Sequence, residues 1–339
     1  MRVSENVPLS SLTTMRLGGP ARYVVEVEQP IETPDAYNFA KLYSLPTAIL
    51  GGGANSIGRD EGFPGAIIMN KIRGIELKPS AENPEVFELK AMGGEIWDDV
   101  VAFACEKGLT GIEALSKIPG TAGAAPVQNI GAYGQDISQV LKSIEAYDTT
   151  DGHFKLLTNK DLKFGYRKSI LNTTMRGRFF VISMTMTLRK GQMARPFYNS
   201  LENFIKENGE TDFSPSSIRR MVSAIRADKL PDPAKIPSAG SFFKNVYIPD
   251  SQVDECRSRG LPVYQGADGN KINSGWLIEK AGLAGKTIHG FHVNEKAALV
   301  LINECATGYE DLIEARNEIA NKVYDRFGFK LEQEPVEIV

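Results

Sequence analysis

Residues 111–137 read GIEALSKIPGTAGAAPVQNIGAYGQDI, and this stretch decides the fold. Small residues dominate it, with glycines at positions 120, 123, 131 and 134. Such a segment can lay its backbone donors against a flat or anionic ligand, because few side chains stand in the way. A buried crossing between two sheets would also explain the glycines, but it would not explain the two amides, Gln128 and Asn129, in the middle.

A second glycine-rich stretch, residues 51–56 (GGGANS), follows a short apolar strand expected at 46–50. Three glycines after a strand indicate main-chain N–H groups wrapped around a phosphate. The spacing is not that of a dinucleotide-binding fingerprint, because Ser56 stands where the third glycine belongs. The turn-rich residues 57–65 also cannot form the helix that such a fingerprint requires. Taken alone, a plain tight turn explains this loop equally well.

Residues 237–245 read PSAGSFFKN, and Ser241 stands at the centre of this segment. The two phenylalanines that follow it are large apolar anchors that would hold the serine still. The next two residues, Lys244 and Asn245, place a cation and an amide beside it, which suits an anionic, oxygen-rich ligand. The alternative interpretation is the end of a strand with two core phenylalanines and an ordinary serine.

The loop at 164–169 (FGYRKS) lies between two expected strands. Its Arg167 can clamp a carboxylate with two parallel hydrogen bonds, and a solvated turn is the alternative interpretation. Farther along, residues 195–198 (RPFY) open a polar helical stretch. An aromatic residue after a proline is exposed unless it covers something, so this stretch is a candidate lid.

The chain has 339 residues, which is long enough for two or three domains. The sequence predicts a helix that begins at Ser214-Pro215 and ends at residues 228–233 (DKLPDP), where we place a domain boundary. The following region has a core of its own, with one helix around Trp276 and another at 310–327. Strands alternate with helices there, which makes this region an α+β domain.

The composition argues against several classes of function. The chain is 42% hydrophobic and 24% charged with a net charge of −3, so it carries no electrostatic footprint for nucleic acid. No apolar run approaches the roughly 20 residues of a membrane span, and the first residues lack a signal-peptide pattern. The cysteines are far apart and odd in number, and the histidines form no H-E-x-x-H pair. We therefore expect no metal site.

Taken in order, these segments resemble the UDP-N-acetylenolpyruvoylglucosamine reductase (UDP-N-acetylmuramate dehydrogenase) family, flavoenzymes of bacterial peptidoglycan precursor synthesis. The likeness covers nearly the whole chain. The motifs that carry it are TTMRLGG at 13–19, GGGANS at 51–56, IPGTAGAAPVQNIGAYG at 118–134, GYRKS at 165–169, RADKLPDP at 226–233, AGSFFKN at 239–245 and LEQE at 331–334. The third and the sixth are highly specific when they occur in this order.

The resemblance implies an α+β fold, with a two-lobed FAD-binding domain of the vanillyl-alcohol-oxidase (PCMH) type and a C-terminal α+β substrate-binding domain. The first lobe would be residues 1–70, the second 71–230 and the substrate-binding domain 231–330, with the tail 331–339 returning near the active site. It implies noncovalent FAD, NADPH as co-substrate and UDP-N-acetylglucosamine enolpyruvate as substrate. It also implies a cytoplasmic monomer, without nucleic-acid or membrane partners, that serves cell wall biogenesis, cell shape and cell division.

Residue by residue, the family's active-site arginine falls on Arg167, its proton-donating serine on Ser241 and its C-terminal carboxylate on Glu334. The flavin contacts fall on Gly51, Gly52, Gly53, Ala54, Asn55, Ser56, Ile118, Pro119, Gly120, Thr121, Gly123, Ala124, Gln128, Asn129, Gly131, Ala132, Tyr133 and Gly134. The substrate contacts fall on Tyr166, Tyr198, Arg226, Lys229 and Asn245. The RPFY stretch is similar to the subtype in which a tyrosine loop closes over the nucleotide.

The chain departs from the family pattern at three places. Ala54 stands where a serine is common and Ala124 where a glycine is common, which costs little if the backbone donates the hydrogen bonds. Pro335 directly follows Glu334 and removes a ladder donor where the family runs into a strand. Either Glu332 or Glu334 then fits the catalytic place, and the family spacing favours Glu334.

Two other functions remain open at this stage. One is an oxidase of sugars or alcohols with the same flavin fold, many of which attach the flavin to histidine. This chain has no histidine before His153, so we expect no covalent flavin in the first lobe. The other is a non-catalytic protein that binds a nucleotide sugar, which would have no need for Arg167, Ser241 and Glu334 together.

Overall fold

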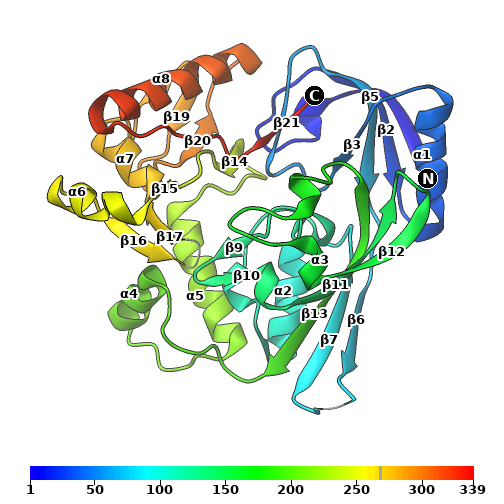
Figure 1. Cartoon of the computed structure of the whole chain (residues 1–339), viewed down its shortest axis with the longest axis horizontal. Helices are drawn as coiled ribbons and strands as arrows, with labels where there is room; N and C mark the ends of the chain where they lie inside the picture. Colours follow the sequence, from blue (N-terminus) through cyan, green and yellow to red (C-terminus); the bar gives the residue numbers. More distant parts are fainter. Residues whose placement is uncertain (82, 267–268) are drawn as a thin grey trace. The chain divides into compact units, whose positions relative to one another are not determined.

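The computed structural model describes residues 1–81, 83–266 and 269–339, which form two compact units (Figure 1). Unit 1 comprises Met1–Asn6, Arg22–Gly52 and Pro64–Asp228, and unit 2 comprises Val7–Ala21, Gly53–Phe63 and Lys229–Val339. The chain passes from unit 1 to unit 2 after Asp228, within the stretch 228–233 where the sequence predicts a domain boundary. Two short N-terminal segments join unit 2, which the sequence did not predict. The division of the first region into lobes at residue 70 stays a prediction.

The larger sheet of unit 1 is antiparallel, with strand order β12-β11-β13-β7-β6 and β8 paired to β13. Its strands are β6 (Ile75–Pro79), β7 (Val86–Met92), β8 (Leu109–Thr110), β11 (Leu141–Asp148), β12 (His153–Thr158) and β13 (Phe179–Lys190). The alternating apolar residues of β13 supply two cores: Met184 and Met186 pack with helix α2 (Trp97–Glu106), whereas Phe180 and Ile182 pack in a second cluster.

That second cluster belongs to a smaller sheet of order β1-β2-β5-β3 and to helix α1 (Thr33–Leu42). The strands are β1 (Arg2–Pro8), β2 (Pro20–Val27), β3 (Thr47–Leu50) and β5 (Phe63–Asn70), and β3 runs parallel to β5. The glycine-rich loop at 51–56 therefore starts where β3 ends, as the sequence predicts. A two-stranded ribbon of β9 (Gly131–Ala132) and β10 (Gln135–Asp136) lies at the end of the other glycine-rich run.

Three further helices complete unit 1, namely α3 (Asn159–Leu162), α4 (Asn199–Asn208) and α5 (Pro215–Lys229). Helix α5 begins at the predicted Ser-Pro pair and buries its apolar stripe of Ile218, Val222 and Ile225. Helix α4 supplies Leu201 and Ile205 to the same cluster. Phe197 of the candidate lid belongs to this cluster too, so the lid stretch packs against the α4–α5 pair.

Unit 2 contains a sheet of order β14-β20-β19-β18, a three-stranded sheet β15-β17-β16 and the pair β21-β4. Its strands are β4 (Ser56–Gly58), β14 (Ser238–Ser241), β15 (Val246–Ile248), β16 (Val263–Gly266), β17 (Gly269–Ile272), β18 (Thr287–Ile288), β19 (Phe291–Val293), β20 (Val300–Asn303) and β21 (Val336–Ile338). Its helices are α6 (Val253–Ser258), α7 (Ser274–Lys280) and α8 (Tyr309–Phe327). Gly328 caps α8 with a φ of 80°, as predicted from its place after the apolar stripe.

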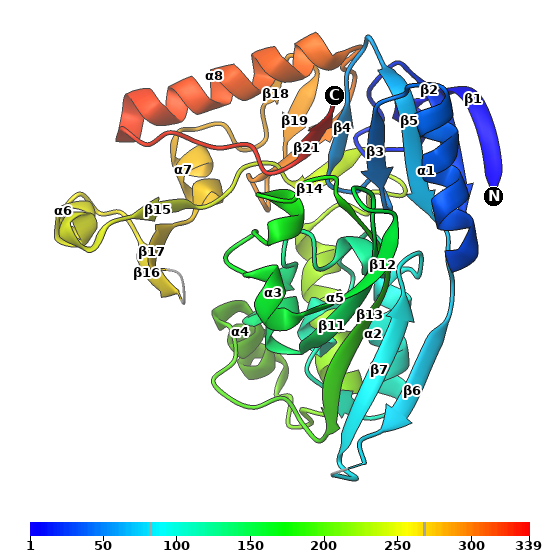
Figure 2. The same ribbon diagram turned by 45° about the vertical axis from the view of Figure 1, so that its right-hand side comes forward.

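The last strand of the chain pairs in parallel with a strand from its N-terminal part. Val336 lies opposite Ser56 and Ile338 opposite Gly58, so β21 runs beside β4 (Figure 2). One core of unit 2 includes Met15 and Ile57 from the N-terminal segments together with residues of α7 and α8. This shared core explains why these short segments belong to unit 2.

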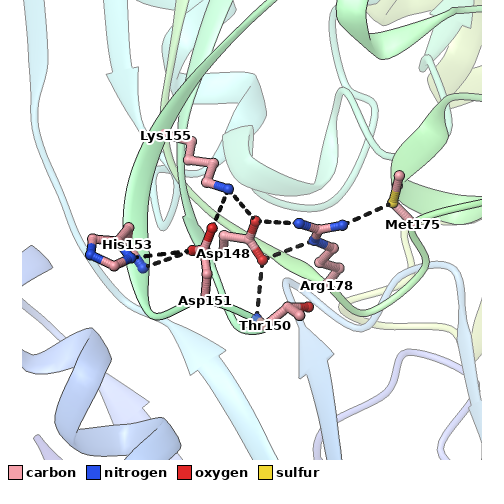
Figure 3. Close-up of polar contacts among 7 residues, drawn as sticks. All are labelled: Asp148, Thr150, Asp151, His153, Lys155, Met175 and Arg178. Atoms are coloured by element: carbon pink, nitrogen blue, oxygen red, sulfur yellow. Dashed lines mark hydrogen bonds and ion pairs between the residues drawn. The ribbon is translucent and has the colours of Figure 1, made fainter.

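An ion-pair cluster closes the β11–β12 hairpin of unit 1 (Figure 3). The carboxylate of Asp148 is inaccessible to solvent and accepts bonds of 2.9 and 2.7 Å from Nε and Nη2 of Arg178. Nζ of Lys155 lies 2.8 Å from Oδ2 of the same carboxylate. The hydrogen bonds from Arg178 and then Lys155 outweigh desolvation and lower the pKa of Asp148 below its ordinary value. The group is therefore ionised and fully paired at neutral pH.

We expect Asp148→Asn to lower the free energy of unfolding by about 1–3 kcal/mol at pH 7. The substitution removes the buried charge and one of the two acceptor oxygens that Arg178 uses, whereas Lys155 keeps Asp151 as a partner. The pKa of Asp148 is depressed in the folded state, so wild-type stability from this group is lost as pH falls below about 4. The difference in unfolding free energy between wild type and Asp148→Asn, measured by urea unfolding, should therefore be smaller at pH 3 than at pH 7. Asp151→Asn, on the same hairpin but exposed, is the control and should be near neutral. An equal loss at pH 3 and pH 7 would contradict the assignment.

Candidate functional site

The glycine-rich run 118–134 is partly bonded within the protein. The amide of Ala122 donates to the carbonyl of Glu95 at 2.8 Å, and that of Gly123 donates to Gly93 at 2.8 Å. A Cβ on Gly123 would lie 2.9 Å from the Gly93 carbonyl oxygen, so only glycine fits this approach. The chain crosses another backbone segment closely here, and the amides of Ala122 and Gly123 are already bonded within the protein.

The other part of the run meets the loop after β3. A Cβ on Gly51 would lie 2.7 Å from Oγ1 of Thr121, and a Cβ on Gly52 would lie 2.9 Å from Cα of Gly120. Within the described residues, Gly51 and Gly52 donate no backbone hydrogen bond, and Thr121 Oγ1 is buried without a partner. Buried polar groups in native proteins are almost always satisfied. These groups fit a bound cofactor with polar edges or phosphates, which FAD supplies.

Arg167 lies in a tight turn in which the amides of Gly165 and Lys168 bond each other's carbonyl oxygens. Its backbone has a φ of 54°, and its Nη2 donates to the carbonyl oxygen of Gly131 at 3.0 Å. Its guanidinium carbon also lies 5.1 Å from the ring centroid of Tyr166. A carbonyl and an aromatic face therefore orient the guanidinium in this turn.

Asn129 has a structural role that the sequence did not reveal. Its side chain is buried, with Nδ2 donating to the carbonyl of Gly165 at 3.2 Å and Oδ1 accepting from the amide of Ser138 at 3.0 Å. The amide thus connects the glycine-rich run to the Arg167 turn. One of the two amides that we predict to contact the flavin therefore also holds the turn of Arg167 in place.

Three predicted ligand contacts lie close together in unit 1. The rings of Tyr133 and Tyr198 meet edge to face, with centroids 6.0 Å apart. Tyr198 is half exposed, and its carbonyl caps α4 by accepting from the amides of Leu201 and Glu202. The Nε of Arg226 is buried without a partner among the described residues, and burial lowers the pKa of this arginine. A buried guanidinium N–H with no acceptor fits an anionic ligand.

Helix α5, which carries Arg226, is held by a carboxylate that sequence reasoning missed. Asp98 accepts bonds of 2.5 and 2.9 Å from Arg219 on α5, and bonds of 2.7 Å from both the amide and Nζ of Lys117. Burial alone would raise the pKa of Asp98, but the bonds from Arg219 and Lys117 lower it. Lys117 immediately precedes the glycine-rich run 118–134, so one carboxylate positions both α5 and that run. Its signal in the sequence was only an acid in the first turn of a helix.

In unit 2, Ser241 is the exposed last residue of β14 and lies opposite Val300 of β20. The next two residues, Phe242 and Phe243, are completely buried, and their rings meet at 5.1 Å. The amide of Phe242 donates to the carbonyl of Leu299 at 2.7 Å. Both interpretations of this segment predict core phenylalanines, and the buried rings fix the backbone on which the hydroxyl stands.

The C-terminal tail runs antiparallel to the segment that follows Ser241. Phe243 and Gln333 form a bridge, and the amide of Glu334 donates to the carbonyl of Phe242 at 2.8 Å. Pro335 precedes β21, so its missing N–H removes no bond from that strand. The side chain of Glu332 is 77% exposed and pairs with Lys244 at 3.4 Å. These features favour Glu334, which is half-buried, over Glu332.

The remaining predicted contacts belong to different parts of the chain. Asn245 accepts a bond of 3.2 Å from the amide of Ser274, at the start of α7. Lys229 is exposed at the end of α5. Of the catalytic candidates, Arg167 belongs to unit 1, and Ser241 and Glu334 belong to unit 2. The described residues include no cluster of metal-ligating side chains and no helix long and apolar enough to cross a bilayer.

Comparison with known proteins agrees with this geometry. Residues 21–157 match the family model described as FAD binding domain, and residues 232–338 match that of the UDP-N-acetylenolpyruvoylglucosamine reductase C-terminal domain. Curated reductases of that name include one from Bdellovibrio bacteriovorus, 34% identical over 99% of both chains. Another, from Paraburkholderia xenovorans, is 35% identical over 97% of this chain and 96% of its own. The crystal structure of such a reductase from Thermus caldophilus superposes over the full length of both chains, with a TM-score of 0.69 and 26% identity.

The fold and the site define an FAD-dependent oxidoreductase, with a two-lobed FAD-binding domain of the vanillyl-alcohol-oxidase (PCMH) type and a C-terminal α+β domain. The chain belongs to the UDP-N-acetylenolpyruvoylglucosamine reductase family. Family membership confirms the fold class that the motifs predicted.

Proposed function

We propose that the protein reduces the enolpyruvyl group of UDP-N-acetylglucosamine enolpyruvate to the lactyl ether of UDP-N-acetylmuramate, with NADPH as reductant. Membership in the reductase family over nearly the full chain supports this. The observation that carries it is a backbone hydrogen bond in unit 2. The amide of Glu334 donates to the carbonyl of Phe242, the residue that follows the exposed Ser241. The proposed setting is peptidoglycan precursor synthesis in the cytoplasm, and through it cell shape and division.

The chemistry explains the choice of residues. Bound FAD, reduced by NADPH, supplies a hydride to the terminal carbon of the substrate's double bond. The electron pair of that bond moves toward the conjugated carboxylate, and the guanidinium of Arg167 stabilises the charge where it develops. The hydroxyl of Ser241 then gives its proton to the adjacent carbon, which completes the reduction. These two catalytic candidates come from different units of the chain.

Glu334 and Lys244 act in unit 2 beside the serine. Lys244 lies three residues after Ser241 and pairs with Glu332. Because Glu332 is largely exposed, this pair is weak and leaves the positive charge beside the serine. This cation favours the serine alkoxide left after proton transfer. Glu334 orients the intermediate from the neighbouring main chain. Buried Nε of Arg226 and half-exposed Tyr198 serve the nucleotide part of the substrate, together with Tyr166, Lys229 and Asn245.

A two-step titration tests the proposal. The purified protein should be yellow, anaerobic NADPH should bleach it, and the enolpyruvyl nucleotide should restore the colour with one lactyl product per flavin. A sugar or alcohol oxidase would instead be reoxidised rapidly by oxygen. A colourless protein that binds the nucleotide would indicate the non-catalytic alternative.

We expect the FAD to be noncovalent. Within residues 21–157, the part that matches the FAD-binding family, the sequence contains one histidine, His153. Its ring is 79% exposed on the edge strand β12 and lies 3.6 Å from Asp151. Acid precipitation should therefore release all of the yellow colour into the supernatant. Colour that stays with the pellet would show a covalent attachment and contradict this prediction.

A further inference from the structure

The residues that follow Ser241 and the tail that carries Glu334 are joined by main-chain bonds on both sides of Gln333. The amide of Lys244 donates to the carbonyl of Glu332, and the amide of Glu334 donates to that of Phe242, both at 2.8 Å. These bonds fix the tail on the near side of Glu334, and the bonds described next fix it on the far side.

The peptide that joins Pro335 to Val336 is held on both sides: the amide of Val336 donates to the carbonyl of Asn55 at 2.9 Å, and the side chain of Gln333 holds the carbonyl of Pro335. Its Nε2 donates to the carbonyl oxygen of Pro335 at 2.9 Å, and its Oε1 accepts from Nη1 of Arg316 on α8 at 3.0 Å. The assignment of the amide follows from the partners, since an arginine can only donate and a carbonyl can only accept. Gln333 thus bridges over Glu334, from the residue before it to the residue after it.

Glu337 anchors the far side of this bridge. Its Oε2 accepts bonds of 3.1 and 2.5 Å from Nε and Nη2 of Arg59, and its Oε1 lies 3.5 Å from both Arg316 Nη1 and Gln333 Nε2. Only 18% of the Glu337 side chain is exposed. Burial raises the pKa of this carboxyl, but hydrogen bonds from Tyr309 and Arg59 outweigh burial and lower it. Glu337 is therefore a charged, fixed point between two arginines from distant parts of unit 2.

We propose that Gln333, Arg316 and Glu337 form a positioning bridge that holds the 335–336 peptide, directly after Glu334. The bridge thereby places the Glu334 carboxyl, which orients the intermediate that receives its proton from Ser241. The inference rests on the proposed function, in which Ser241 and Glu334 act after hydride transfer. The three bridge residues act through Glu334 and not on the substrate. The nearest alternative is a network that only stabilises the C-terminus.

Three variants separate these roles. Gln333→Leu keeps the size of the side chain and removes both bonds, whereas Gln333→Glu still accepts from Arg316 but cannot donate to Pro335. Arg316→Leu removes the support from α8, while Arg59 still pairs with Glu337. Lys322→Leu, on the same helix but paired with Glu318, is the matched control.

The first measurement is amide hydrogen exchange in the resting enzyme, without substrate. Peptides that cover residues 332–338 should exchange about tenfold faster in the three bridge variants and at the wild-type rate in the Lys322→Leu control. The second is stopped-flow absorbance of the two half-reactions. Bleaching by NADPH should stay within about twofold of wild type, whereas reoxidation by the enolpyruvyl nucleotide should slow by ~10²-fold, because misplacement by about 1 Å has that cost.

If the wild-type enzyme completes both half-reactions, two results with the variants would overturn the inference. One is faster exchange with unchanged reoxidation, which would show that Glu334 needs no bridge. The other is an equal loss in both half-reactions together with lost FAD, which would show a purely structural network. A wild-type enzyme that NADPH reduces but the nucleotide does not reoxidise would overturn the proposed function itself, and the inference with it.

Discussion

Ser241→Ala should leave bleaching by NADPH at the wild-type rate and slow reoxidation by the enolpyruvyl nucleotide by ~10²–10⁴-fold. Ser241 donates its proton only after hydride transfer, so it has no part in the first half-reaction. The structure makes the substitution mild, because Ser241 is exposed while the buried rings of Phe242 and Phe243 hold the backbone. Rapid mixing of oxidised enzyme with NADPH, and then of reduced enzyme with the nucleotide, separates the two steps.

Two comparisons make the result for the serine specific. Ser241→Cys keeps an acidic group at the same place and should recover part of the reoxidation rate, whereas Ser251→Ala, an exposed serine of the same unit, should change neither step. If Ser241→Ala reoxidises normally, the proton comes from Glu334 or water. If both half-reactions fail together, the serine supports the fold of β14 and is not the donor.

Arg167→Lys should reduce turnover by ~10²–10³-fold, although the charge is conserved. A lysine cannot reproduce the planar donor geometry in which Nη2 bonds the carbonyl of Gly131 while the guanidinium lies over Tyr166. An ammonium group placed farther from the carboxylate, where negative charge develops, stabilises the dianion less. Steady-state turnover with the enolpyruvyl nucleotide, normalised to bound FAD, is the measurement.

The control is Arg176→Lys, an exposed arginine farther along the same connection between strands, which should keep wild-type turnover. Bound FAD must be measured for each variant, since Arg167 also bonds the carbonyl of a residue in the glycine-rich run. Normal turnover in Arg167→Lys would show that Arg167 is only a turn residue. Lost turnover that follows lost FAD in proportion would show that the arginine holds the cofactor loop instead.

The sequence alone determined the elements whose signals are local. The Ser-Pro pair and the apolar stripe predict α5, and the stripe that ends at Gly328 predicts α8, because side-chain periodicity and caps depend on residues a few positions apart. Two adjacent phenylalanines were enough to predict the buried anchor beside Ser241, as burial of large apolar side chains dominates folding. The motifs in order were enough to predict the family.

Only the tertiary structure decided which groups support those motifs. Asn129, a predicted flavin contact, also bonds Gly165. Asp98 holds Lys117 and Arg219 together, although its signal in the sequence was only an acid in the first turn of a helix. The pairing of Glu334 with Phe242 joins residues about ninety positions apart in the chain, and Pro335 is harmless because it falls just before a strand. Such contacts depend on where distant segments meet in space, and no local periodicity or turn preference records that.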